Sequence, residues 1–169
     1  MIILGIDAGI ANTGFGLITA DGGKLQLLDY GNIKTEDNIE SAHRLMLIYD
    51  GLIHLVERYQ PDYFSLEDLF FSKNVSSAFA VGEAKGVTKL AAAKTDREVF
   101  SYTPAQVKLA VVGYGKATKR QVQKMVKVLL KLDETPKPDH AADALALAIC
   151  HARSHRVLKL REKYERQMP

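Results

Sequence analysis

Three acidic residues and one histidine stand where a divalent metal ion and a phosphodiester could meet. The first is Asp7, which ends the apolar segment IILGID and precedes the small, glycine-punctuated stretch AGIANTG. On an extended strand Ile3, Gly5 and Asp7 share one face, and glycines in the next turn let a phosphate come close to the backbone. Asp7 therefore either binds a cation at the mouth of a buried strand or caps the turn through an Asx hydrogen bond.

The second acidic residue is Glu67, in the segment DYFSLED. Glu67 shares one face of this strand with Tyr63 and Ser65, at the C-terminal end. Ligand sites in α/β sheets gather at that end of the strands. Asp68, on the other face, is a rival carboxylate that we expect to turn into the following loop. Taken alone, either carboxylate could serve only the fold.

The last two candidates open the helical segment DHAADALALAIC. Asp143 lies in an apolar run, where an unpaired carboxylate is costly unless it is paired or binds a metal. His140 lies three residues before it and Asp139 four before, so each can share its helix face. Asp139 is a good N-cap, so we assign Asp139 to structure and His140 with Asp143 to the site. A histidine at a helix start can equally be a surface or capping residue.

Apolar periodicity and turn residues predict the elements that position these side chains. Residues 1–35 hold three short strands joined by tight turns, which indicates an antiparallel meander. Alternating helices and strands follow, with helices predicted over 41–59, about 75–94, 104–113, 118–132 and from 140, and strands over 62–68 and 98–103. This order predicts an α/β fold of the ribonuclease H-like type, a mixed five-stranded sheet with helices on both faces.

Length and composition limit the class of protein. The 169 residues, 47% hydrophobic and 25% charged, suit one nuclease-sized domain over 1–169, with a charged and loose tail over 156–169. No apolar run reaches the length of a membrane span, and the N-terminus lacks the basic region of a secretory signal. One cysteine excludes an intramolecular disulfide and a cysteine-rich zinc site. We therefore expect a cytoplasmic protein.

Charge is distributed unevenly along the chain. Residues 1–100 hold 9 Lys and Arg against 14 Asp and Glu, whereas residues 101–169 hold 14 against 6. A basic segment on a mildly acidic chain suggests a polyanion partner, and a solvated helix face is the alternative. Within it, a row of cations spaced four, three and four residues apart is predicted to line one helix face: Arg120, Lys124, Lys127 and Lys131.

Four sequence blocks, in order, resemble the RuvC family of resolvases: GIDAGIANTGFG, PDYFSLEDLFFSKN, VKLAVVGYGKATKRQVQKMV and PKPDHAADALALAIC. The resemblance runs from residue 2 to about 152. It implies a Holliday junction resolvase, a homodimeric hydrolase that nicks four-way DNA junctions symmetrically in recombination and repair. It implies 5′-phosphate and 3′-hydroxyl ends, and RuvA and RuvB as partners.

The resemblance also implies a metal site formed by Asp7, Glu67, His140 and Asp143. Two Mg²⁺ ions would serve there. Some members carry Asp where this chain has His140, and because imidazole is a softer ligand, Mn²⁺ could replace Mg²⁺. His140 could instead transfer protons.

The same resemblance suggests DNA and dimer contacts. An aromatic matching Phe70 stacks on unpaired bases in the family, and Lys108 and Lys119 match basic positions used on DNA. The basic segment adds Lys116, Arg120 and Lys124 as phosphate contacts. Ala78, Gly82 and Gly86, spaced four apart, suggest a dimer contact, although an internal neighbour would explain them equally well.

Three alternatives remain open at the level of sequence. A ribonuclease H-like enzyme could act on another nucleic acid, such as an RNA–DNA hybrid. An ATPase of the sugar kinase and actin type has a similar phosphate loop, but this chain holds no second copy of it. A non-catalytic junction-binding protein would lack the full acidic set.

Overall fold

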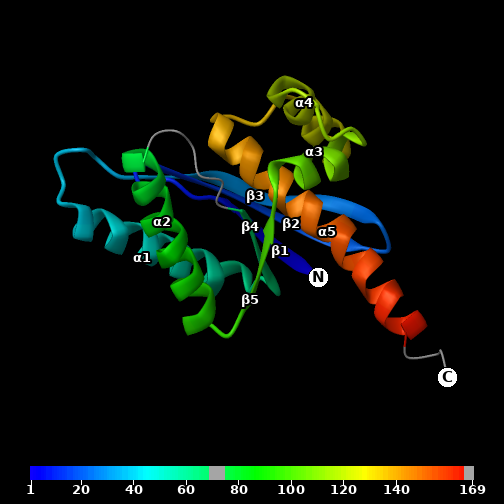
Figure 1. Ribbon diagram of the computed structural model, residues 1–169, viewed down its shortest axis with the longest axis horizontal. Helices are drawn as coiled ribbons and strands as arrows, with labels where there is room; N and C mark the ends of the chain where they lie inside the picture. The colour runs from blue at the N-terminus through cyan, green and yellow to red at the C-terminus, as the bar shows by residue number, and fades with distance from the viewer. Residues whose placement is uncertain (69–74, 166–169) are drawn as a thin grey trace.

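Five strands form one mixed sheet in a computed structural model that describes residues 1–68 and 75–165 (Figure 1). The order across the sheet is β3-β2-β1-β4-β5. β1 pairs antiparallel with β2, and β2 with β3, while β4 runs parallel to both β1 and β5. The strands are β1 (Ile2–Asp7), β2 (Asn12–Asp21), β3 (Lys24–Lys34), β4 (Tyr63–Glu67) and β5 (Glu98–Tyr102). The predicted meander and ribonuclease H-like sheet are confirmed.

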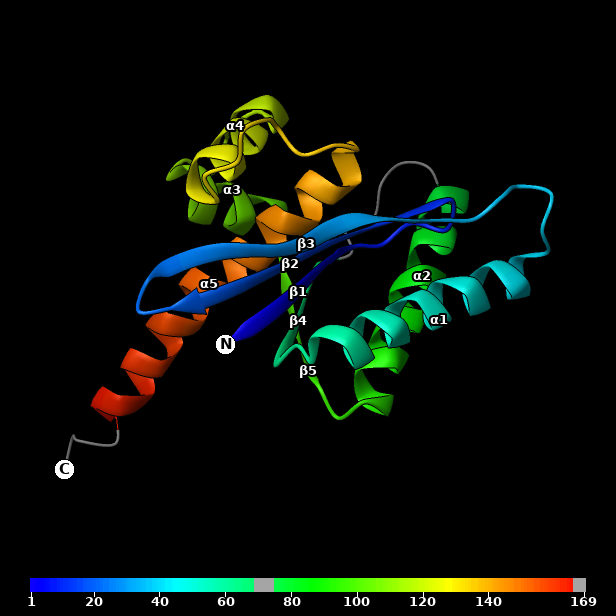
Figure 2. The same cartoon turned by 180° about the vertical axis from the view of Figure 1, so that it is seen from behind.

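Helices cover both faces of this sheet (Figures 1 and 2). They are α1 (Ser41–Tyr59), α2 (Val75–Lys94), α3 (Pro104–Val112), α4 (Lys119–Leu129) and α5 (Asp139–Glu165). One core lies between the sheet and α1 with α2, and a second lies between the sheet and α3, α4 and α5. None of the helices in the described part of the chain has an apolar stretch of the length needed to cross a bilayer.

Strand alternation assigns each side chain to one of these two cores. On β1, Leu4 and Ile6 are buried toward α1 and α2, whereas Ile3 is buried toward α5. Since Gly5 and Asp7 share the face of Ile3, the carboxylate at the end of β1 points to the α5 side. The face predicted from the sequence is therefore the one that α5 covers.

Two boundaries differ from the sequence analysis. The row of cations has one member fewer than predicted and ends at Lys127, because α4 stops at Leu129 and Lys131 adopts a left-handed conformation (φ 54°). Leu130, the C-cap of α4, is buried on the same side as Val126, and the left-handed conformation of Lys131 ends the helical path after it. The tail expected to be loose from 156 is instead helical to Glu165, because 156–165 contains no Gly or Pro and is rich in helix-forming Leu, Lys, Arg and Glu.

A buried aromatic and histidine cluster fixes α5 against the edge of the sheet. His151 has no exposed surface, and the Tyr102 hydroxyl lies 2.7 Å from its Nδ1. The rings of Tyr63 and Phe100 pack against His151 at centroid distances of 5.0 and 4.5 Å. Burial, with a smaller effect of the nearby His155, lowers the pKa of His151 to about 4, so the folded state holds this histidine neutral.

The neutral His151 predicts a loss of stability in mild acid. The unfolded state takes up a proton near pH 6.5 and the folded state only near pH 4, so the free energy of unfolding falls as the pH drops through this window. Between pH 7 and pH 5 this residue's contribution falls by about 2 kcal/mol, at about 1.4 kcal/mol per pKa unit. Urea denaturation at both pH values measures it, and His151→Gln, which keeps an acceptor for Tyr102, removes it. An equal pH dependence in both proteins would contradict the prediction.

Candidate active site

Two neighbouring parallel strands bring the first two predicted site residues together. The β1–β4 ladder pairs Ile6 with Leu66, so Asp7 and Glu67 follow at adjacent strand ends. Ser65, on the same face as Glu67, donates its hydroxyl to the Leu147 carbonyl of α5 at 2.8 Å. Both carboxylates therefore face α5.

Three glycines let α5 lie directly on the sheet. A β-carbon at Gly5 would overlap the Ala144 carbonyl, and one at Gly14 would overlap the His140 carbonyl. One at Gly16 would lie 2.7 Å from the backbone nitrogen of Leu145. Because real β-carbons do not approach other atoms so closely, only glycine permits this packing. It places the first turn of α5 over the end of β1.

His140 contacts Asp7 across this junction. Its Nδ1 lies 2.7 Å from Asp7 Oδ2. Since a carboxylate oxygen accepts, Nδ1 is the donor and Nε2 remains for another partner. The sequence left two purely structural roles open, an Asx cap of the turn for Asp7 and a helix cap for His140. This hydrogen bond between the two side chains is neither of them.

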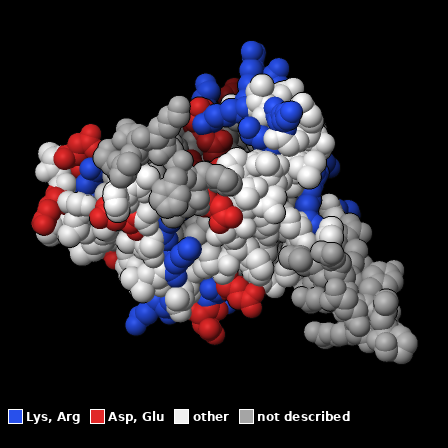
Figure 3. Space-filling view, in the orientation of Figure 1, with Lys and Arg blue, Asp and Glu red and all other residues white. Residues whose placement is uncertain are grey.

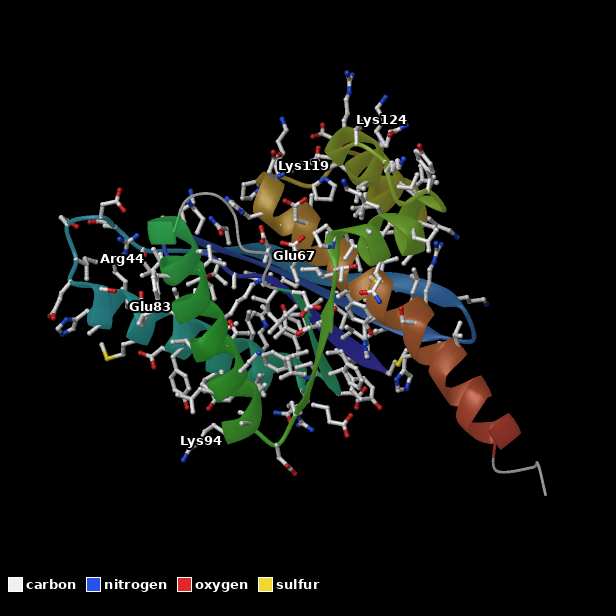
Figure 4. All side chains as sticks on the ribbon, in the orientation of Figure 1. Arg44, Glu67, Glu83, Lys94, Lys119 and Lys124 are labelled. Carbon is white, nitrogen blue, oxygen red and sulfur yellow. The ribbon has the colours of Figure 1, made fainter. Side chains whose placement is uncertain are left out.

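Lys119 contacts the other predicted ligand on α5. Its Nζ donates to Asp143 Oδ2 at 2.7 Å and lies 3.5 Å from Asp139 Oδ2. Lys119 is the first residue of α4, where Thr118 and Gln121 form a capping box; Figure 4 places it above Glu67. Asp139, expected as an N-cap, is the first residue of α5, and its carboxylate faces this lysine instead.

Burial raises the pKa of two carboxylates in this cluster. Burial, followed by the charge of Asp7, raises the pKa of Glu67. Burial also raises the pKa of Asp143, although Lys119 counteracts it. Carboxylates that are both buried and close to one another are stabilised in their charged form by an added cation.

The donor set fits a divalent metal ion. Carboxylate oxygens are the ligands of Mg²⁺, and one imidazole nitrogen broadens the choice toward Mn²⁺. In this conformation, however, no three His, Cys, Asp or Glu side chains of the described residues are arranged around one point as ligands. Asp7 is hydrogen-bonded to His140, and Asp143 to Lys119. The predicted metal ligands are therefore gathered in one cluster, but these two carboxylates point to protein groups.

A cleft of about 210 Å³ opens over this cluster. Its charged lining consists of Asp7, Glu67, Asp143, Lys108 and Lys119. The two lysines come from α3 and α4, so cations and carboxylates face the same space. A larger groove of about 950 Å³ lies between the β2–β3 turn and the middle of α5, and none of the predicted site residues lines it.

The cations predicted to bind DNA divide into two groups. Lys108 and Lys119 line the cleft, whereas Lys116, Arg120 and Lys124 are exposed outside it. Figure 3 shows basic atoms gathered over α4, with acidic atoms directly beside them, and Lys124 points outward from α4 in Figure 4. Phe70 lies outside the described residues.

Lys85 is a residue that the sequence analysis missed. It lies on α2, is 7% exposed, and donates from Nζ to the Glu67 carbonyl at 2.6 Å. Burial lowers the pKa of Lys85, while the charges of Glu67 and Asp7 act in the opposite direction. Its helical spacing could have revealed it, because Lys85 lies three residues before Thr88 and seven before Ala92. Both of these residues are fully buried, so Lys85 places a lone charge on a buried helix face.

Comparisons with known proteins agree with this arrangement. A family profile described as crossover junction endodeoxyribonuclease RuvC matches residues 3–151. A protein of that name from Alkaliphilus metalliredigens is 53% identical over 154 residues, covering 91% of this chain and 94% of the relative. The Thermus thermophilus RuvC structure superposes with a TM-score of 0.87 at 36% identity, covering 93% of this chain and 96% of that one. A second structure, of the same protein in complex with a Holliday junction substrate, gives a TM-score of 0.90 over the same shares.

The glycine contacts predict that a methyl group at residue 14 disrupts the site. Gly14→Ala forces the first turn of α5 away from β2 and separates His140 from Asp7. A misplacement of about 1 Å in an active site costs roughly a hundredfold in the rate of the reaction. Gly115→Ala is the matched control, since its β-carbon would lie an ordinary 3.6 Å from the nearest atom. Strand-cutting rates and urea denaturation of both variants are measured. Cutting by Gly14→Ala at the rate of the control would show that α5 need not lie this close.

Proposed function

The chain belongs to the RuvC family of crossover junction endodeoxyribonucleases, so its activity is the cutting of Holliday junctions, and we propose that the Asp7 cleft performs it with divalent metal ions. The observation that carries this proposal is the convergence of three carboxylates from β1, β4 and α5 on one cleft, with His140 hydrogen-bonded to one of them, Asp7. No other described cavity of the molecule gathers such a set.

Asp7, Glu67, Asp143 and His140 would hold the metal ions, of which we propose two Mg²⁺ per site. When bound, such ions activate a water for attack on phosphorus and stabilise the leaving oxygen. The P–O3′ bond breaks, and the products are a 5′-phosphate and a 3′-hydroxyl. The raised pKa values of Glu67 and Asp143 support this role, because burial penalises their charged forms and a bound cation would stabilise them.

The cleft lysines orient the phosphate in this proposal. Lys108 and Lys119 are the cations of the cleft, and an incoming phosphodiester offers each an anionic oxygen. Lys119 then exchanges its carboxylate partner Asp143 for the phosphate. His140 keeps Asp7 in place through Nδ1 and presents Nε2 to an ion or a proton.

Outside the cleft, α4 offers a surface for the arms of the junction. Arg120 and Lys124 are exposed one turn apart, and Lys116 precedes the helix. Their charges neutralise phosphates and release counterions, which makes binding dependent on salt. Lys119, the first residue of α4, lines the cleft, so one strand could run from the basic surface of α4 into the site.

We further propose a homodimer formed through α2. One face of this helix carries Phe79 and Leu90, which are 72% and 59% exposed. Between them, β-carbons added at Gly82 and Gly86 would meet open space, so the small residues do not serve an internal neighbour. Exposed apolar groups flanking glycines favour a close helix contact with a second copy. A two-fold dimer matches the two related strands of a junction. Contacts with RuvA and RuvB remain a prediction from the resemblance.

Asp7→Asn tests the metal site. The substitution removes one ligand charge with little change of shape, so we expect cutting to be abolished and junction binding to persist. The matched control is Asp68→Asn, an exposed carboxylate next to Glu67, which should cut normally. Labelled four-way junction, linear duplex and RNA–DNA hybrid are incubated with Mg²⁺, Mn²⁺ or EDTA. Paired symmetric nicks in the junction alone, lost with EDTA, support the proposal. Cutting by Asp7→Asn rejects the site. Cutting of the RNA–DNA hybrid favours the ribonuclease H alternative.

Leu90→Glu tests the dimer. A carboxylate within an apolar contact is desolvated without a partner, so we expect sedimentation equilibrium to shift from dimer to monomer. Paired nicking should then give way to single nicks. Leu109→Glu on α3 is the control, because Leu109 is equally exposed, at 58%, but lies away from α2. A dimer that survives Leu90→Glu places the interface elsewhere.

A further inference from the structure

A buried lysine lies behind the acidic cluster rather than in the cleft. Lys85 projects from α2 toward the end of β4 and donates to the Glu67 carbonyl at 2.6 Å. It is not among the described residues that line the cleft, so it faces the cluster from the opposite side to Lys108 and Lys119. Its exposure is only 7%, and bound DNA would not reach it.

Burying an ammonium group is costly unless its charge and its donors are used. The Glu67 carbonyl accepts one of the three N–H donors. The negative charges that act on Lys85 are those of Glu67, Asp7 and Asp68, in decreasing order. An apolar residue would fill the same position on α2, next to buried Thr88 and Ala92, at no such cost. A stability role alone therefore leaves the choice of lysine unexplained.

The accepting carbonyl lies where the sheet no longer holds the chain on both sides. The β1–β4 ladder ends at Ile6 and Leu66, one residue before Glu67. On the β5 side, the Asp68 amide donates to the Tyr102 carbonyl at 2.8 Å. Lys85 is thus the contact that fixes the Glu67 peptide from the side of α2, directly at the residue whose carboxylate enters the cleft.

We propose that Lys85 is a positioning residue for Glu67 in the cutting reaction, and this rests on the proposed function of the cleft. Its ammonium holds the Glu67 peptide, so that the carboxylate projects at one fixed angle beside Asp7. Outer contacts of this kind typically change metal affinity or activity 10–100-fold when removed.

Lys85→Met, which keeps the length of the side chain and removes the charge, is the principal variant. Lys85→Arg keeps both charge and donors, and Lys89→Met is the matched control, because Lys89 lies one turn further along α2 and is exposed. Three quantities are measured for each full-length protein: Mn²⁺ affinity without DNA by electron paramagnetic resonance, the rate and metal half-saturation of junction cutting, and urea stability. Lys85→Gln replaces Lys85→Met if the latter does not fold.

Positioning predicts that Lys85→Met binds Mn²⁺ more weakly and cuts roughly 10–100-fold more slowly, that Lys85→Arg restores most of both, and that Lys89→Met matches the wild type. Loss of a nearby positive charge by itself would tighten Mn²⁺ binding, so tighter binding with normal cutting would overturn the proposal. Lower urea stability with unchanged Mn²⁺ affinity and cutting would also overturn it, by showing a role in the fold only. Failure of the wild type to cut junctions would reject the proposed function instead, and the Mn²⁺ comparison would still test Lys85.

Discussion

The direct contact between α5 and strands β1 and β2 is the constraint on which the site depends. Gly5, Gly14 and Gly16 provide no side chain between helix and sheet, so the backbone of α5 rests on the backbone of the strands. At this separation the first turn of the helix reaches the end of β1, and His140 hydrogen-bonds to Asp7. A layer of ordinary side chains would hold helix and sheet about 10 Å apart and leave the two halves of the site out of contact.

Charge is balanced around this contact in two ways. Within the cleft, Asp143 is paired with Lys119, a residue whose own position comes from the capping box of α4. Behind the cleft, Lys85 provides a cation that is fixed by burial and by the Glu67 carbonyl. The first cation lies on an exposed helix end and can exchange partners with a phosphate, whereas the second cannot leave. A cluster of half-buried carboxylates is tolerated because both kinds of cation surround it.

The two faces of the sheet thereby carry different tasks. The face under α5 holds the cleft, and α3 and α4 add the basic residues around it (Figure 1). The other face is covered by α1 and α2, and α2 turns exposed apolar residues outward. Lys85 is the described contact by which α2 reaches the acidic cluster. The proposed substrate cleft and the proposed dimer contact therefore lie on separate faces of the sheet, although α5 and α2 both border the ends of β1 and β4.

The sequence by itself determined the strand and helix order and the inward faces, because alternation and helical spacing are local properties of the chain, and the family resemblance singled out Asp7, Glu67, His140 and Asp143 as the proposed metal site. It misplaced the end of α4 and the state of residues 156–165, since a helix ends where tertiary burial competes with propensity. Only the tertiary structure decided which groups pair, such as Lys119 with Asp143 and Lys85 with the Glu67 carbonyl. These contacts join segments far apart in the chain, and no local pattern encodes the distance between them.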